Sequence, residues 1–391
     1  MTILLTGADG YCGWPVFLKL AKEFPNERIV GVDNFARRQW VKEVGAISAI
    51  PIADIETRLD VAREHGFTNM TFIEGDLTNR AFVDELFCVF KPQIIVHVAA
   101  QPSMPYAQIN GERAHYTQWN NNTSTRNILW GMRENGLLES LLIETTTTGV
   151  YGAPEFEIPE GFIEVEYKGG RDTILFPGMA GSWYHMSKSA DVSNLWLANK
   201  QWQLSIVDLR TAIVYGTATE ETSLDQRLST RFDFDFYFGV VGNRFIAQAL
   251  AGYPITIYGK GEQRKPTISL QDMVNSTAAA VRRGANGGRF EVFNQVTAAV
   301  SILRWARAIQ KGAALVGVEV EIIHVPNPRK EKEGHKMVIN NDGLRRELLP
   351  EQAYDIESGL EQALCDLVPH KGKISQYTDT FLPPALQAAT R

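Results

Sequence analysis

The sequence has few cysteines and no metal-binding pattern. Its three cysteines, Cys12, Cys88 and Cys365, are odd in number and far apart, and its seven histidines are scattered. This excludes a small domain held by disulfides and gives no ligand set for a metal ion. A reducing compartment is therefore expected.

Long apolar runs and basic tracts are also absent. No apolar segment approaches the roughly 20 residues that cross a bilayer. The formal net charge of −6 at pH 7 gives no basis for nucleic-acid binding. The first strand is predicted to begin at Ile3, which leaves no room for a targeting peptide. We expect a soluble, cytoplasmic protein without nucleic-acid or membrane partners.

The first half of the 391-residue chain alternates short apolar runs with amphipathic stretches. Such runs are typical of strands buried on both faces of a parallel sheet. The predicted strands are Ile3–Thr6, Arg28–Asp33, Met70–Glu74, Ile94–Val98 and Leu141–Thr145, with helices over Trp14–Glu23, Arg80–Phe90 and Thr123–Asn135. The alternation predicts an α/β fold with a doubly wound parallel sheet of the Rossmann type. Two later runs, Ser205–Arg210 and Phe290–Asn294, are predicted to return to the same sheet.

A glycine-rich turn follows the first predicted strand. Gly7, Gly10 and Gly13 lie between that strand and a predicted helix. In this context glycines permit a tight turn, close approach of the backbone to a pyrophosphate and close helix–strand packing. The unpaired N–H groups and the dipole of the helix favour anions. The turn predicts a dinucleotide site, with an ordinary glycine turn as the alternative.

A carboxylate at the end of the second predicted strand bears on the choice of dinucleotide. Asp33 lies 20 residues after the last of these glycines and can accept hydrogen bonds from ribose hydroxyls, which favours NAD over NADP. Arg37 and Arg38 follow closely and keep a 2′-phosphate open, and a helix-capping role is the other interpretation of Asp33. Asp76 and Leu77, after the third predicted strand, are candidate adenine contacts or parts of a simple turn.

Tyr184 and Lys188 lie four residues apart, on one face of a predicted helix. The charge of the lysine favours the phenolate, so that the tyrosine can take a proton from a sugar hydroxyl. Thr147, at the end of the fifth predicted strand, is placed to hydrogen-bond the same hydroxyl. A Y-x-x-x-K pattern alone is common on surfaces, but together with the turn and Thr147 it predicts hydride transfer to a nicotinamide.

The chain is predicted to form two domains. Residues 1–216 form the NAD-binding domain, whose sheet is completed by residues 289–296, and residues 217–391 form mainly a smaller, mixed α/β substrate-binding domain. Residues 217–238, rich in charge and aromatic side chains, are predicted to be a long loop or insertion, and a lid over the substrate is one hypothesis for them. The Pro- and Ala-rich tail after Thr378 is expected to be peripheral.

Further motifs extend over nearly the whole chain. They are D-G-Y-C-G-W at 9–14, V-D-N at 32–34, S-W-Y-H-M-S-K at 182–188, V-F-N-Q at 292–295 and V-P-N-P-R at 325–329. With these motifs the sequence resembles the extended short-chain dehydrogenase/reductase family of NAD-dependent epimerases and dehydratases, and within it the UDP-sulfoquinovose synthases. The glycine and Y-x-x-x-K motifs are shared by the whole superfamily.

The resemblance implies oxidation of a UDP-glucose-type sugar at C4 by bound NAD, loss of water across C5–C6, addition of sulfite at C6 and return of the hydride. It implies Thr147, Tyr184 and Lys188 as catalytic residues. The implied cofactor contacts are Gly7, Gly10, Tyr11, Cys12, Gly13, Asp33, Asn34, Arg37, Asp76, Leu77, Ala99, Asn121, Tyr184 and Lys188. The implied substrate contacts are Gln101, Thr147, Thr148, Arg210, Thr211, Asn243, Lys265 and Arg329. By the same analogy, a homodimer forms through the predicted helices at 111–135 and 184–200.

The sequence departs from the synthases at three places. The segment after the fourth predicted strand ends in Pro102, where the synthases have arginine. Val150 replaces a glutamate near the catalytic threonine, and Arg210-Thr211 replace an Asn-Gln pair. These changes affect sulfite addition more than they affect oxidation of the sugar.

Three alternatives therefore stay open. A nucleotide-sugar epimerase uses the same C4 oxidation. A 4,6-dehydratase is less favoured, because those enzymes carry an Asp-Glu pair as acid and base where this chain has Thr148 and Gly149. A cofactor-binding protein without catalysis is disfavoured by the presence of Thr147, Tyr184 and Lys188.

Overall fold

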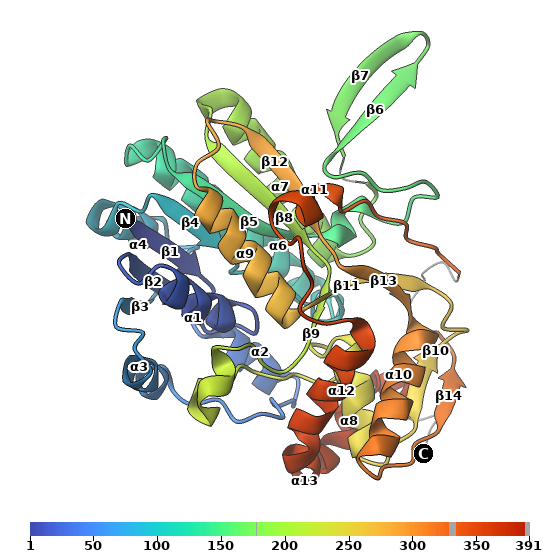
Figure 1. Cartoon of the computed structure of the whole chain (residues 1–391). Helices are drawn as coiled ribbons and strands as arrows, with labels where there is room; N and C mark the ends of the chain where they lie inside the picture. Colours follow the sequence, from blue (N-terminus) through green and yellow to red (C-terminus); the bar gives the residue numbers. More distant parts are fainter. Residues whose placement is uncertain (177, 328–333, 388–391) are drawn as a thin grey trace.

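A parallel sheet forms the centre of the larger lobe in the computed structural model, which describes residues 1–176, 178–327 and 334–387 (Figure 1). Its strands are β1 (Thr2–Thr6), β2 (Arg28–Asp33), β3 (Met70–Glu74), β4 (Ile94–His97), β5 (Leu141–Thr147), β8 (Ser205–Thr211) and β12 (Phe290–Gln295). They lie in the order β12-β8-β5-β4-β1-β2-β3 with parallel neighbours. The predicted doubly wound sheet is confirmed, including the return of the two later strands.

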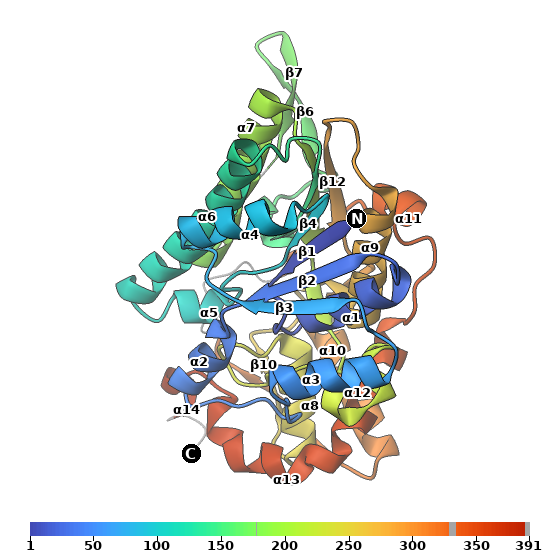
Figure 2. The same cartoon turned by 90° about the vertical axis from the view of Figure 1, so that its left-hand side faces the viewer.

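Helices cover both faces of this sheet (Figure 2). One face packs on α1 (Gly13–Glu23) and α9 (Leu270–Arg283), and the other on α4 (Arg80–Phe90), α6 (Gly111–Glu134) and α7 (Trp183–Trp202). Further helices are α2 (Ala36–Glu43), α3 (Ile55–Glu64), α5 (Met104–Ala107), α11 (Asp342–Glu347) and α13 (Lys371–Ile374). Among the described residues, no helix combines the length and apolar character that a bilayer crossing requires.

Within the described residues, a smaller lobe mixes short strands with three helices of ten or more residues, and the short α13 also packs into its core. The helices are α8 (Val241–Leu250), α10 (Ile302–Leu315) and α12 (Ile356–Leu367), and the strands are β9 (Ile213–Tyr215), β10 (Ile255–Tyr258), β11 (Arg264–Ser269), β13 (Ala298–Ser301) and β14 (Ile322–Val325). They pair as β13-β11-β9 and β10-β14, and the lobe has its own core around Phe245 and Trp305. This is the predicted mixed α/β part. The boundary after residue 216 stays a proposal, because α9 and β12 return to the larger lobe.

Residues 217–238 pack more tightly than a surface loop. They contain two short 3₁₀ helices, η2 (Thr222–Leu224) and η3 (Gln226–Leu228), and the indole of Trp14 donates to the Leu228 carbonyl (2.7 Å). Phe232 and Phe234 are buried in the core of the smaller lobe. Their aromatic side chains therefore serve packing, which the lid hypothesis did not anticipate.

The expectation of a peripheral tail was wrong. After η5 (Ser375–Thr380), the side chains of Phe381 and Leu382 are buried in the core of the smaller lobe, before the short α14 (Pro384–Gln387). The N–H of Phe236 donates to the Thr380 carbonyl (2.7 Å). Two large apolar side chains outweigh the Pro- and Ala-rich composition around them, because burying each contributes on the order of 2 kcal/mol.

An antiparallel hairpin projects from the larger lobe (Figure 1) and was not predicted. Its strands are β6 (Phe162–Tyr167) and β7 (Gly170–Leu175). Lys168 and Gly169 connect them, with φ of 50° and 79°. Two successive positive φ values match the twist of the flanking strands in a two-residue hairpin turn. Phe162, at the base of the hairpin, packs edge-on against Trp196 of α7.

Candidate active site

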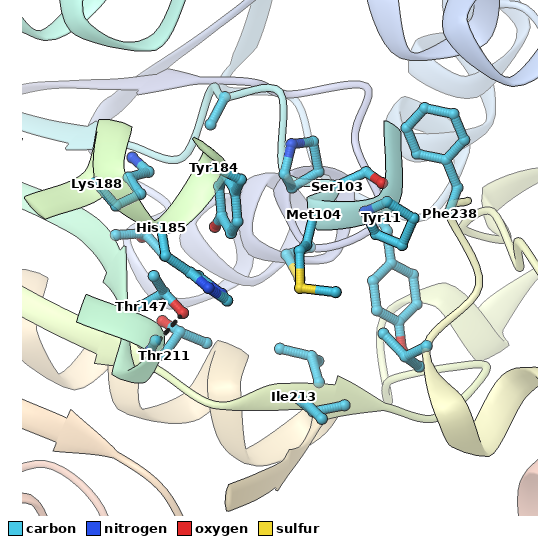
Figure 3. Close-up of a pocket in the computed structure, with 18 of the residues that line it drawn as sticks. Tyr11, Ser103, Met104, Thr147, Tyr184, His185, Lys188, Thr211, Ile213 and Phe238 are labelled. Atoms are coloured by element: carbon cyan, nitrogen blue, oxygen red, sulfur yellow. Dashed lines mark hydrogen bonds between the residues drawn. The ribbon is translucent and has the colours of Figure 1, made fainter. Parts of the chain in front are cut away.

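A cleft of about 1300 Å³ opens where the carboxyl ends of the parallel strands face the smaller lobe. The sheet order reverses between β1 and β4, and ligands of doubly wound sheets bind at such a point. The walls come from the glycine turn, the ends of β4 and β5 and the start of α7, and, across the cleft, from Arg244, Tyr258 and Lys265 of the smaller lobe. Figure 3 shows the middle of this cleft.

The glycine turn lines the cleft at the start of α1 and requires residues without a side chain. Gly7 has φ of +75°, and a Cβ there would lie 2.8 Å from the backbone nitrogen of Ala99. A Cβ at Gly13 would collide with the Gly7 carbonyl. Cys12 precedes α1 without a side-chain cap, and the first turn holds no acidic residue. The helix N-terminus at the cleft is therefore suited to an anion.

Asp33 and Asn34 follow β2 at the edge of the cleft. The carboxylate of Asp33 accepts hydrogen bonds from the N–H groups of Asp9 (2.9 Å) and Phe35 (2.7 Å). Burial, together with the nearby charge of Asp9, raises the pKa of Asp33 to about 6. Asn34 accepts from the N–H of Ala36, and both residues hold the chain at the edge of the predicted ribose site.

Arg37 and Arg38 are held by carboxylates of the protein. Arg37 donates to Asp233 through Nε (3.2 Å) and Nη2 (2.6 Å), and its guanidinium stacks on the Phe238 ring at 4.2 Å. Arg38 donates to both oxygens of Asp9 (2.7 and 2.6 Å). A 2′-phosphate would have to displace these ion pairs, so the arrangement favours NAD.

The remaining predicted cofactor residues divide between two walls. Tyr11 and Cys12 line the cleft beside the turn, and the Tyr11 hydroxyl donates to the Gly216 carbonyl (2.7 Å). Burial raises the pKa of the Cys12 thiol to about 12, which keeps it neutral. Asp76, Leu77 and Ala99 line the cleft after β3 and β4.

Thr147, Tyr184 and Lys188 lie on one wall of the cleft (Figure 3). Thr147 ends β5, and its hydroxyl accepts from the N–H of Gly149 (3.2 Å). Ser182 caps α7 by accepting from the N–H of His185 (3.1 Å), which fixes the first turn that carries Tyr184. Lys188 follows one turn later on the same side.

The charge of Lys188 is shared with two buried carboxylates. Its Nζ lies 3.0 Å from Oε1 of Glu144 and 3.5 Å from Oδ2 of Asp191. Burial lowers the pKa of Lys188, but these carboxylates outweigh burial and leave it above its usual value. Burial raises the pKa of Tyr184, and Lys188 only opposes this rise. The expected activation of the tyrosine by the lysine is thus incomplete in the protein alone.

Comparison with known proteins identifies the family to which the chain belongs. Residues 3–294 match the NAD dependent epimerase/dehydratase family. The chain belongs to this family. It is 40% identical over 335 residues to the chloroplastic UDP-sulfoquinovose synthase of Spinacia oleracea, covering 85% of this chain and 68% of that protein. It is 35% identical over 388 residues to the UDP-sulfoquinovose synthase of Sulfolobus acidocaldarius, covering 98% and 96%.

A solved structure shares the fold of this family member. The UDP-glucuronic acid 4-epimerase of Bacillus cereus, in complex with UDP-glucuronic acid and NAD, superimposes with a TM-score of 0.69. The superposition covers 94% of the present chain and 99% of the epimerase chain, and the two sequences are 20% identical. At this identity the likeness concerns the architecture of the two lobes.

In the present chain, two of the predicted site residues, Gln101 and Asn121, lie behind the residues that line the cleft. Asn121 donates to the hydroxyl of Ser187 (2.9 Å) and the carbonyl of Gln101 (3.1 Å). Gln101 is buried and donates to Thr117 (2.7 Å). The pair ties the segment after β4 to α6 and α7, so both residues support the wall of the cleft without lining it.

Two further predicted substrate residues also have partners within the protein. Arg210 donates to Asp208 (3.0 Å) and the Phe176 carbonyl (2.6 Å). Asn243 donates to the carbonyl of Asp233 (3.1 Å). Neither lines the cleft, whereas Thr148, Thr211 and Lys265 do. The predicted Arg329 lies outside the described residues.

His185 is a cleft residue that the sequence interpretation missed. It is half-buried, and its ring packs against Tyr184 with centroids 5.2 Å apart. A Cβ on Gly149 would collide with this ring. Its position next to Tyr184 in the motif was the available signal. Met104, Ile213 and Phe238 also line the cleft (Figure 3). The sequence interpretation did not select Met104 and Ile213, and Phe238 belongs to residues 217–238, for which a lid was one hypothesis.

The carboxylates that line the cleft lie at its nucleotide end. Among the described lining residues they are Asp33 and Asp76. The position after Thr148 is Gly149, and His185 occupies the space that a side chain there would need. The geometry of this family member thus argues against a dehydratase with an acidic pair beside the catalytic threonine.

Proposed function

We propose that this chain is an NAD-dependent enzyme that oxidises the C4 hydroxyl of a UDP-glucose-type nucleotide sugar and completes the reaction of a UDP-sulfoquinovose synthase. The observation that carries the proposal is the presence of Thr147, Tyr184 and Lys188 in the cleft that also holds the glycine turn. The identities of 40% and 35% to two synthases support it.

The nucleotide end of the cleft fits NAD. Gly7 and Gly13 let the turn pack against the backbone of Ala99 and of Gly7 itself, α1 starts without a side-chain cap, and Asp33 lies at the edge of the cleft. Bound NAD supplies the acceptor for the hydride of the sugar carbon. The residues proposed to hold it are Gly7, Gly10, Tyr11, Cys12, Gly13, Asp33, Asn34, Asp76, Leu77 and Ala99.

Three side chains of this chain carry the proposed proton transfer. Tyr184 takes the proton of the C4 hydroxyl as the hydride leaves the same carbon. The hydroxyl of Thr147 hydrogen-bonds the same oxygen and orients it. Lys188 favours the phenolate form of Tyr184 through its charge. The ketone formed at C4 acidifies the neighbouring C5–H, which prepares the loss of water.

The smaller lobe is proposed to hold the diphosphate of the sugar nucleotide. Arg244 and Lys265 bring positive charge to the cleft wall opposite the catalytic residues, and the Arg244 guanidinium stacks on the Tyr258 ring at 4.3 Å. Guanidinium and ammonium groups suit phosphate oxygens. Arg329, outside the described residues, is proposed as a further diphosphate contact.

Sulfite is the proposed second substrate, and epimerisation is the second candidate reaction. His185 beside Tyr184 brings an imidazole to the sugar end, where it can attract an anion when protonated. Pro102, however, lines the cleft where the synthases carry arginine. This loss of a cation favours an epimerase that uses the same oxidation.

Mass spectrometry of sugar-nucleotide reactions tests the proposed function. Purified protein with NAD is incubated with UDP-, dTDP-, GDP- and CDP-sugars, with and without sulfite, and Tyr184→Phe serves as the inactive control. The synthase reaction gives a sulfonated product from UDP-glucose only with sulfite. A product of unchanged mass without sulfite identifies an epimerase, and no conversion of any sugar contradicts the proposal.

A homodimer through α6 and α7 is also proposed. Trp119 and Trp130 of α6 and Met186 and Leu197 of α7 are exposed in the single chain. Exposed large apolar side chains on two adjacent helices are typical of an interface. We expect a dimer by light scattering and a monomer for Trp119→Glu with Leu197→Glu, whereas Val89→Glu on the exposed side of α4 leaves the dimer intact.

We further propose that the protein works in a reducing compartment, the cytoplasm. Its cysteines are free in the structure, and two of them are exposed. Disulfides form where exposed thiols meet an oxidising environment. Alkylation of rapidly quenched cells is expected to label all of these thiols, and a mixed disulfide at Cys88 or Cys365 would contradict the proposed compartment.

A further inference from the structure

A row of polar side chains crosses the centre of the parallel sheet. Thr6 of β1 pairs in register with His97 of β4, His97 with Glu144 of β5, and Glu144 with Asp208 of β8. All four are buried. Two positions earlier on β5, Leu142 lies in the apolar core under α7. Buried parallel strands ordinarily carry apolar side chains, so this row has another cause than packing.

Helix α7 brings the ammonium of Lys188 into contact with Glu144, one of the four residues of this row. Lys188 donates from Nζ to Oε1 of Glu144 at 3.0 Å. One turn later on α7, Asp191 lies 3.5 Å from the same nitrogen and is held by Asn122 (2.7 Å). The contact joins the sheet row to the helix that carries Tyr184. Glu144 therefore reaches the tyrosine through the lysine.

Three atoms around this contact lack a hydrogen bond. Oε2 of Glu144, Oδ2 of Asp191 and Nε2 of His97 are buried without a hydrogen-bond partner among the described residues. His97 is anchored at its other nitrogen, which lies 2.6 Å from the Thr6 hydroxyl. Unsatisfied buried polar atoms are costly, and where they persist they cluster at sites of chemistry.

The charges of the cluster oppose one another. Burial raises the pKa of Glu144 to about 7, against the effect of Lys188. Burial, with Lys188 as a further cause, lowers the pKa of His97 to about 3, so that this ring is neutral. The groups that face Glu144 are Lys188 and Asp191 from α7, His97 from β4 and Asp208 from β8. Loss of the Glu144 carboxylate therefore alters the net charge beside Tyr184.

We propose that Glu144 is a positioning residue for the oxidation: its carboxylate holds the ammonium of Lys188 at the foot of the cleft and sets how much positive charge acts on Tyr184. This inference rests on the proposed function, in which Tyr184 takes the proton of the sugar. Glu144 does not line the cleft, so it acts through Lys188 and touches neither substrate nor cofactor.

The pH profile of Glu144→Gln tests this role. The amide keeps the shape of the side chain but removes its negative charge, so Lys188 acts on Tyr184 with less opposition. The acidic limb of kcat/KM for the sugar nucleotide is expected to move to lower pH by about one unit. Glu221→Gln is the matched control, because Glu221 is a buried glutamate that pairs with Lys19 and Lys22 away from the cleft. A limb that moves no more in Glu144→Gln than in this control overturns the proposal.

A second variant and a second readout keep the test decisive. Asp191→Asn removes the other carboxylate beside Lys188 and is expected to move the acidic limb of kcat/KM to lower pH as well. This variant replaces Glu144→Gln if Glu144→Gln does not fold. An acidic limb that Asp191→Asn leaves unmoved counts against the proposal. Phenolate absorbance of the NAD-loaded protein, taken as the difference from Tyr184→Phe, reads the tyrosine without turnover. If the wild type converts no sugar nucleotide, the proposed function fails, while a lower phenolate midpoint in Glu144→Gln still supports the role of Glu144 and an unchanged midpoint overturns it.

Discussion

Two charge clusters support different parts of the cleft wall, and they are built differently. Under the glycine turn, Asp9 accepts from Arg38 at both oxygens and from Arg58 at 2.9 Å. We call Asp9, Arg38 and Arg58 the turn cluster. Near Tyr184, Glu144 and Lys188 form the lysine cluster with the neighbouring Asp191 and His97. One oxygen of each of its carboxylates lacks a hydrogen bond within the described part of the chain.

We infer from this difference that the turn cluster stabilises the fold and that the lysine cluster affects the reactivity of Tyr184. Both oxygens of Asp9 are engaged, and Arg58 is fully buried with its guanidinium 3.8 Å from the ring of Trp14. Nε of Arg58 is buried without a hydrogen bond among the described residues, but each oxygen of the Asp9 carboxylate has a guanidinium partner. Charge pairs with a fully engaged carboxylate fix a backbone arrangement. Burial shifts a pKa in both clusters, lowering that of Arg58 to about 9 and raising that of Glu144 to about 7. The lysine cluster differs because its carboxylates keep unpaired oxygens and because its lysine lines the cleft, which is the pattern of a functional site.

The largest effect is expected at the turn cluster. Asp9→Ala leaves the buried Arg58 without its carboxylate, and breaking a buried pair in this way costs about 3–5 kcal/mol of folding free energy. Urea unfolding measures it. Asp60→Ala, which removes the exposed partner of Arg63, is the control and changes stability by less than about 0.5 kcal/mol. Equal losses in the two variants would remove the distinction between the clusters.

The next-largest effect is expected on turnover, with the stability of the fold unchanged. Tyr184→Phe removes the proton acceptor above the lysine cluster and is expected to lower turnover at least ~10²-fold. NAD binding and the thermal midpoint stay unchanged, because the ring remains. Tyr167→Phe on the exposed hairpin is the control and keeps full turnover. A Tyr184→Phe enzyme that turns over normally removes this residue from the mechanism.

A smaller effect links cofactor affinity to pH at the nucleotide end. The pKa of Asp33 is raised from 3.8 to about 6 in the folded protein, so the carboxyl gains its proton as the pH falls through 6. A protonated Asp33 accepts ribose hydroxyls poorly, and NAD affinity is expected to fall about tenfold between pH 7.5 and pH 5. Titration calorimetry measures it. Asp33→Asn should flatten the dependence, and a wild type with constant affinity contradicts the assignment of Asp33.

The strands of the sheet and the nucleotide turn were predictable because local signals determine both. The strands at Arg28–Asp33 and Met70–Glu74 have the predicted bounds, since continuous apolar runs specify burial on both faces. The glycines of the turn occupy positions where a Cβ would collide, as at Gly7 and Gly13. Such constraints act within a few residues and are visible in the sequence.

Side-chain partners far apart in sequence were not predictable. Arg37 pairs with Asp233, and Arg210 turns toward Tyr151 and the Phe176 carbonyl, which only the folded chain brings together. Gln101 and Asn121 were expected at the substrate and cofactor but bind each other. Nothing in the sequence indicated that Glu144, at the end of an apolar run, contacts Lys188. The packing of α7 on β5 in the folded chain creates this contact.

The central claim is reversible oxidation of the sugar at C4. UDP-glucose carrying deuterium at C4 tests it most directly, with the product analysed by mass spectrometry in the presence of sulfite and excess unlabelled NAD. The account predicts that rapid quenching during turnover finds the deuterium transiently on the nicotinamide, and that the finished product carries it again at C4. A nicotinamide that stays free of deuterium at every time point while product forms contradicts it, as does the absence of product from any sugar nucleotide.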